Sequence, residues 1–142
     1  MSEVNKKKLI RNIVAVLGGM LLAAIVAYLV EGIGHSIWPP PELPDGTTPE
    51  QATAAAAAWM KIAPIGAMLM VALAHLVGVA VGVWFAFKMQ KGFKLAGMIV
   101  GVIFLLMALA TWAMITHPFW FMVVDFVAIV IGIVIPWRAL KS

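Results

Sequence analysis

Four long apolar segments dominate this sequence, and they constrain its fold more than any other feature. They cover approximately residues 9–38, 63–87, 95–116 and 118–137. A helix needs roughly 20 predominantly apolar residues to cross a bilayer, whereas a membrane β-barrel would show short segments of alternating polarity. The sequence therefore predicts an all-α membrane protein, a single domain over residues 1–142. Its four transmembrane helices are expected to form an up-down bundle.

The composition excludes a soluble globular domain. Hydrophobic residues make up 64% of the chain and charged residues 11%, against about 45–50% and about 25% in soluble domains. In a soluble protein, the net charge of +4 would suggest a nucleic-acid partner. Here the basic residues flank apolar segments, so no nucleic-acid partner is expected. The chain has no cysteine, which excludes disulfides, thiolate metal sites and cysteine nucleophiles.

The basic residues predict the orientation in the membrane, because Lys and Arg concentrate in short cytoplasmic loops. Nine of the ten fall on one side of the predicted helices: Lys6, Lys7, Lys8, Arg11, Lys88, Lys91, Lys94, Arg138 and Lys141. Only Lys61 falls on the other side. Both termini are therefore expected in the cytoplasm of a bacterium, with loop 39–62 outside the inner membrane. The first apolar segment is longer than a signal-peptide core of roughly 7–15 residues, so it is expected to remain uncleaved.

Loop 39–62 contains the signature of a short additional helix. Thr48 precedes Pro49, and Gln51 follows three residues after Thr48, which is the pattern of a capping box with proline at the first helical position. An alanine-rich run over 52–59 follows. We expect a short amphipathic helix at the outer membrane surface, anchored by Trp59 and Met60.

Small residues at four-residue intervals indicate close helix packing. The second apolar segment carries Ala74, Gly78, Gly82 and Ala86, the third carries Gly97 and Gly101, and the first carries Gly18 and Gly19. Such spacings let helix backbones approach closely in lipid, either within the bundle or between subunits. Because a bundle of 142 residues has little space for a transport pathway within one chain, the expected partners besides the bilayer are further copies of the chain or a larger membrane complex.

Ionisable residues inside membrane spans are candidates for function, and four of them are predicted to form one cluster in the outer half. With a rise of about 1.5 Å per residue, Glu31 and Asp125 lie roughly 10 Å below the outer helix ends, with His35 and His117 above them. Tyr28 shares a helix face with Glu31 and His35 because three and four residues separate them. Glu31, His35, His117, Asp125 and Tyr28 are thus the candidate ion or proton site.

Three interpretations of this cluster remain open. A self-satisfied hydrogen-bond network ranks first, a proton or metal pathway second and catalysis third. No cofactor is expected; if a divalent metal bound, its ligands would be Glu31, His35 and His117, since Zn, Mn and Fe accept imidazole together with carboxylate. Haem ligation by the two histidines ranks lower.

His75 is predicted to lie apart from this cluster. It falls roughly 18 Å below Ala63, near the middle of the membrane, between the small residues Ala74 and Gly78 on the same segment. A lone histidine in this setting typically forms a polar contact between helices.

Two motifs resemble a known family. Val30-Glu31-Gly32-x-Gly34-His35 continues into Trp38-Pro39-Pro40-Pro41, and His117-Pro118-Phe119-Trp120-Phe121 opens the last segment. Together they resemble small four-helix bacterial membrane proteins without an established activity. The resemblance implies the fold and a bacterial inner-membrane location, and no site residue carries over.

The expected function is that of a non-enzymatic accessory or structural membrane subunit. The alternative is a small oligomeric transporter or channel for protons or metal cations that uses Glu31 and Asp125. A membrane redox or metal-binding enzyme subunit ranks third.

Overall fold

The structure, a computed structural model, describes residues 3–90 and 95–139, and this part of the chain is helical without strands. Its helices are α1 (Glu3–Ile37), α2 (Pro49–Ile62), α3 (Ile65–Met89), α4 (Leu95–Met114) and α5 (Phe119–Ala139). Helices α1, α3, α4 and α5 are long and apolar enough to cross a membrane. This confirms the predicted all-α class and the four long apolar helices. Three basic residues used for the topology prediction, Lys91, Lys94 and Lys141, lie outside the described residues.

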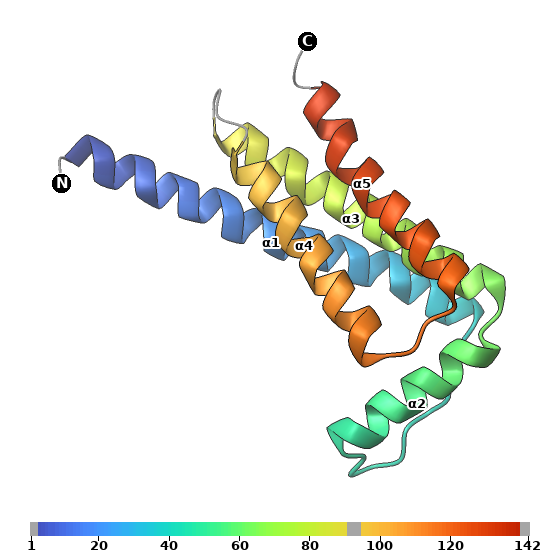
Figure 1. The fold of residues 1–142 in the computed structure, drawn as a ribbon. Coiled ribbons are helices and arrows are strands. Elements are labelled where there is room, and N and C mark those ends of the chain that lie inside the picture. The colour runs from blue at the N-terminus through green and yellow to red at the C-terminus, as the bar shows by residue number, and fades with distance from the viewer. Residues whose placement is uncertain (1–2, 91–94, 140–142) are drawn as a thin grey trace.

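Helix α3 is at the centre of the long helices, where it packs against α1, α4 and α5. Figure 1 shows that the C-terminal ends of α1 and α4 and the N-terminal ends of α3 and α5 all lie towards α2. We call this side the α2 end of the molecule. Helix α2 itself lies beyond the long helices and contributes no fully buried residue.

The contact between α1 and α3 brings two backbones together through small residues. A Cβ added at Gly82 would lie 2.5 Å from the Gly19 carbonyl oxygen and 2.7 Å from Ala23 Cβ. One turn away, a Cβ at Gly78 would lie 2.7 Å from the Ala23 carbonyl oxygen and 3.0 Å from Ala27 Cβ. Gly78 and Gly82, predicted as packing residues, therefore pack within one chain, and no larger side chain fits between these backbones.

Helix α1 begins at Glu3, earlier than the predicted start at residue 9. Lys and Arg are good helix formers, so the basic residues that precede the apolar run continue the helix. The first buried residue of α1 is Ala15. The N-terminal part of α1 consequently projects beyond the other long helices, as Figure 1 shows.

The predicted capping box at α2 is confirmed. Gln51 N donates to Thr48 Oγ1 at 3.3 Å, and Thr48 N donates to Gln51 Oε1 at 2.9 Å. The helix runs over Pro49–Ile62: it starts at the proline, as predicted, and continues for a turn beyond the predicted alanine-rich run 52–59. The predicted membrane anchors, Trp59 and Met60, are among the half-buried residues of this helix.

The contact between α1 and α3 predicts opposite effects of alanine at two glycines. Gly82→Ala places a methyl group against the backbone of α1 and should lower the free energy of unfolding by about 1–3 kcal/mol. Gly32→Ala is the matched control, because a Cβ there meets nothing within 4 Å, and it should be neutral or stabilising by up to about 1 kcal/mol. Thermal unfolding in lipid nanodiscs measures both, and equal shifts would contradict this packing.

Candidate functional site

Three ionisable side chains from three helices meet near the α2 end. His75 on α3 lies between Asp125 on α5 and Glu31 on α1. Its Nδ1 is 2.7 Å from Asp125 Oδ1, a hydrogen bond, and its Nε2 is 3.8 Å from Glu31 Oε1. The second distance allows an ion pair but exceeds hydrogen-bond length. We refer to these residues as the Glu31–His75–Asp125 cluster.

The helix packing explains why Glu31 and His75 meet. Gly78 contacts Ala27 across the α1–α3 contact, and His75 and Glu31 lie one turn from these residues on the same helix faces. Cα–Cβ bonds tilt towards the N-terminus of a helix, and the N-terminal ends of α1 and α3 point in opposite directions. The side chain of His75 therefore reaches towards the α2 end, while that of Glu31 reaches away from it.

This tilt, together with the oblique path of α1, explains why depths counted along the sequence predicted that His75 lies apart from the carboxylates. Depths counted from the helix ends assume parallel helices that start at one level. Figure 1 shows α1 crossing α3 and α4 obliquely. His75 is thus a member of the cluster as well as the predicted contact between helices, and sequence reasoning missed this membership.

Asp125 is the most constrained member of the cluster. The residue is 0% exposed, and among the described residues its second oxygen, Oδ2, has no hydrogen-bond partner. A buried polar atom without a partner is unfavourable and rare in native proteins. Helix α4 contacts the cluster through Phe104, whose ring is edge-on to that of His75 at 5.4 Å between centroids.

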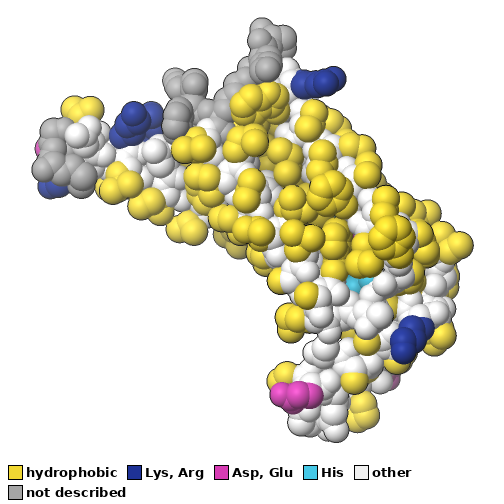
Figure 2. All heavy atoms as spheres, viewed as in Figure 1, with side chains coloured by type: hydrophobic (Ala, Val, Ile, Leu, Met, Phe, Trp, Pro, Cys, Tyr) yellow, Lys and Arg dark blue, Asp and Glu magenta, His cyan; other side chains and the backbone are white. Residues whose placement is uncertain are grey.

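A cavity of about 300 Å³ adjoins this cluster, and we call it the polar cavity. Its walls come from α1, α3, α4, α5, the α4–α5 connection and Met60 of α2. They include four of the five predicted site candidates, together with His75: Glu31, His35, His75, His117 and Asp125. Figure 2 shows imidazole atoms at the surface between α2 and the apolar faces of the long helices.

His117 and His35 line the cavity without bonding directly to the cluster. His117 Nδ1 donates to the Ile115 carbonyl oxygen at 2.6 Å, and its ring stacks on Phe121. This bond leaves Nε2 as the acceptor of the neutral imidazole. His35 is exposed. Tyr28 is 76% exposed and is absent from the walls of the cavity.

The carboxylates and imidazoles are of metal-ligand type, but their arrangement is not that of a metal site among the described residues. Among residues 3–90 and 95–139, no group of three or more His, Asp or Glu side chains is arranged to hold a metal ion. Glu31, His35 and His117 line one cavity but do not converge on a point. The arrangement offers instead hydrogen-bond acceptors: the carboxylate of Glu31, Oδ2 of Asp125 and Nε2 of His117.

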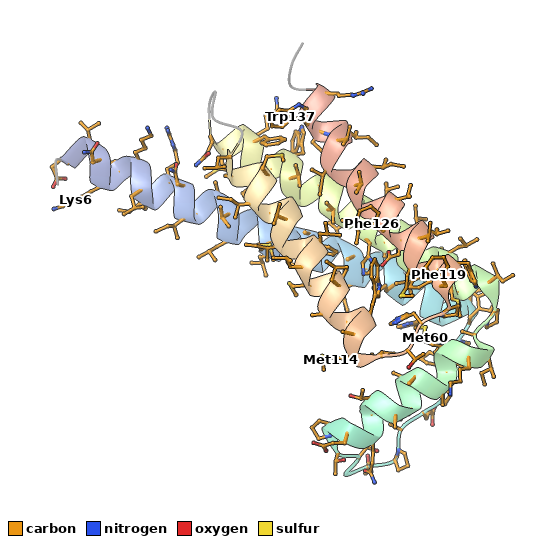
Figure 3. All side chains as sticks on the ribbon, in the orientation of Figure 1. Lys6, Met60, Met114, Phe119, Phe126 and Trp137 are labelled. Carbon is orange, nitrogen blue, oxygen red and sulfur yellow. The ribbon has the colours of Figure 1, made fainter. Side chains whose placement is uncertain are left out.

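A second cavity of about 280 Å³ lies between α2, the proline-rich segment and the ends of α1 and α3; we call it the apolar cavity. Its walls are apolar apart from Glu31 and His35. These two residues, with Met60 and Val71, also line the polar cavity. Figure 3 shows Met60 at the junction between α2 and the long helices.

Comparison of the chain with protein-family models, with curated proteins and with solved structures gave no match. The function is therefore inferred from the site itself.

The His75–Asp125 bond predicts non-additive stability changes. Asp125→Leu leaves His75 Nδ1 without its partner and should lower the free energy of unfolding by about 1–3 kcal/mol. The double variant His75→Leu/Asp125→Leu replaces both polar groups by apolar ones and should recover much of this loss. Unfolding in nanodiscs measures both, with the exposed neighbour Val124→Leu as control. The two residues would instead be independent if His75→Leu lowered the free energy of unfolding by the same amount in Asp125→Leu as in the natural chain.

Proposed function

We propose that this chain is a non-enzymatic accessory subunit of a bacterial cytoplasmic membrane that binds a small hydrogen-bond-donating or cationic group at the Glu31–His75–Asp125 cluster. The group enters from the outer side through the polar cavity. This proposal combines the accessory role with a binding site and assigns no transport activity.

The observation that carries the proposal is the position of Asp125. A fully buried carboxylate, with one oxygen bonded to His75 and the other without a partner among the described residues, lines a cavity of about 300 Å³. A purely structural network favours pairing of every buried polar atom. An acceptor left over beside a cavity is typical of a site that receives a donor from a ligand, because functional sites retain features that a stability-driven core would lose.

Charge favours the same class of ligand. Glu31 and Asp125 both face His75, so two carboxylates surround one imidazole. Ionisable groups in a membrane span are stabilised by partners of opposite charge. An ammonium or another N–H donor would complete this arrangement, whereas an anion would be repelled by the carboxylates.

The core beyond the cluster supports binding rather than conduction. Towards the end opposite α2, the long helices pack through fully buried Val79, Val83, Val100 and Ile129. Within the part of the chain that the structure describes, the buried polar or charged residues are Asp125 and Gln90. Gln90 lies at the C-terminal end of α3, where it donates to Asn12. An apolar layer therefore separates the two polar regions.

The charge distribution supports an outer location for the α2 end. Basic side chains lie at the N-terminal part of α1, which also carries Glu3, and at the C-terminal end of α5, whereas the region of α2 carries acidic side chains together with Lys61 (Figure 2). By the positive-inside rule, this distribution favours α2 on the outer side. Helix α2 lacks fully buried residues, which fits a helix that lies at the membrane surface, as we propose.

Single cysteines test ligand entry, because the natural chain has none. Thr111→Cys places a thiol on the wall of the polar cavity, and Ala113→Cys places one on an exposed part of α4 outside it. In nanodiscs, methylammonium at ten times its Kd should slow thiol labelling at position 111 about tenfold and leave position 113 unchanged. Asp125→Asn in the same background should weaken this protection.

Tetramethylammonium serves as the ligand control, because it has the charge but no N–H donor. Equal protection by both cations would contradict hydrogen-bond recognition at Asp125. An unchanged labelling rate at position 111 with methylammonium would overturn recognition of a small ammonium ligand at the cluster.

Flux measurements test whether the protein lacks a continuous proton pathway across the membrane. Proteoliposomes that contain the protein should lose an imposed proton gradient at the rate of empty liposomes, because the described residues of the apolar layer around Val83 and Val100 include no buried polar side chain to carry a proton. A pH-sensitive dye inside the vesicles measures this rate, and a protonophore provides the positive control. Faster loss that Glu31→Gln abolishes would favour the transporter alternative instead.

A further inference from the structure

The apolar cavity has features of a built pocket for a hydrocarbon chain. One face of α2 lines it through Ala52, Ala55, Ala56 and Trp59, which follow helical spacing. Pro40 and Pro41 close a second side. The ring of Trp38 packs over Gly66 so closely that a Cβ there would lie 2.5 Å from it. The alanines of α2 thus leave open a space that larger side chains would fill.

Water is a poor occupant of such a space. A bound water needs two to four polar partners, and among the described residues the ionisable ones in this wall are Glu31 and His35. Both lie where the apolar and polar cavities share walls. Each cavity is near the lower limit of the roughly 300–1,000 Å³ typical of small-molecule sites. The two together offer space for a chain and a head.

We propose that the two cavities hold one single-chain amphiphile, with its apolar chain beneath α2 and its hydrogen-bond-donating head at Glu31 and His35, directed towards Asp125. This rests on the proposed function, because the head is the donor group assigned there to the cluster. The residues with hydrogen-bond acceptors on the walls of the polar cavity are Glu31, His117 and Asp125. The shared chemistry is a hydroxyl or ammonium group on a hydrocarbon chain.

The arrangement assigns separate roles to the two cavities. The apolar cavity selects for a chain by excluding water from it, which contributes affinity in proportion to the apolar area buried. The acceptors select for a donor head, since an acceptor-only head leaves the buried oxygen of Asp125 without a partner. Met60 and Val71, which line both cavities, contact the chain where it joins the head.

Ligand protection of single cysteines tests this proposal. Ala56→Cys places a thiol on the wall of the apolar cavity, and Ala58→Cys places one on an exposed face of α2 outside both cavities. The probes are dodecanol and dodecylammonium, which differ in the source of the donor, and 1-methoxydodecane, which only accepts hydrogen bonds. The protein is held in nanodiscs without free detergent, and the labelling rate of each thiol is measured with Thr111→Cys in parallel.

The expected result is that dodecanol, dodecylammonium or both slow labelling at positions 56 and 111 about tenfold at ten times their Kd, with position 58 unchanged. The apparent Kd of 1-methoxydodecane should be weaker by about tenfold or more. Protection by dodecanol alone identifies a neutral hydroxyl amphiphile, and protection by dodecylammonium alone identifies a cationic one.

Other results separate the two proposals. Protection at position 111 without protection at position 56 overturns the chain-binding site and leaves the donor site standing. Equal protection by 1-methoxydodecane overturns recognition of the head. If no probe, methylammonium included, slows labelling at either position, the chain-binding site and the proposed function are overturned together.

Discussion

The close contact between α1 and α3 is the constraint on which the rest of the structure depends. Gly19, Gly78 and Gly82 let the two backbones approach so closely that a Cβ would collide with a carbonyl oxygen of the facing helix. In lipid, where no hydrophobic effect drives helices together, such close packing supplies the association energy. The same contact brings Glu31 to His75. A feature that stabilises the fold therefore also positions the site.

The site combines two requirements that usually conflict. His75 and Asp125 link α3 to α5 with a short hydrogen bond, as a structural element would. Yet Asp125 Oδ2 has no hydrogen-bond partner among the described residues, which lowers stability, and the residue adjoins the polar cavity. Binding energy from a ligand can offset such a loss. This is the physical reason for treating the cluster as a binding site.

The sequence predicted the secondary structure well because its signals are local. Apolar length identified the four long helices, and Thr48 with Gln51 identified the cap of α2. The sequence also predicted that Glu31, His35, His117 and Asp125 face a common region, and all four line the polar cavity. It missed His75 because side-chain tilt and helix crossing are properties of packing. It missed the apolar cavity because a face of alanines signals helix rather than empty space.

Nitrogen NMR of the histidines tests the central claim most directly. The chain has three histidines, so ¹⁵N-histidine labelling in nanodiscs gives few signals, and His35→Asn and His117→Asn assign them. If the site is built on the His75–Asp125 hydrogen bond, the His75 Nδ1 signal changes in Asp125→Asn and shifts when methylammonium is added. His75 signals that respond to neither would contradict a ligand site built on this hydrogen bond.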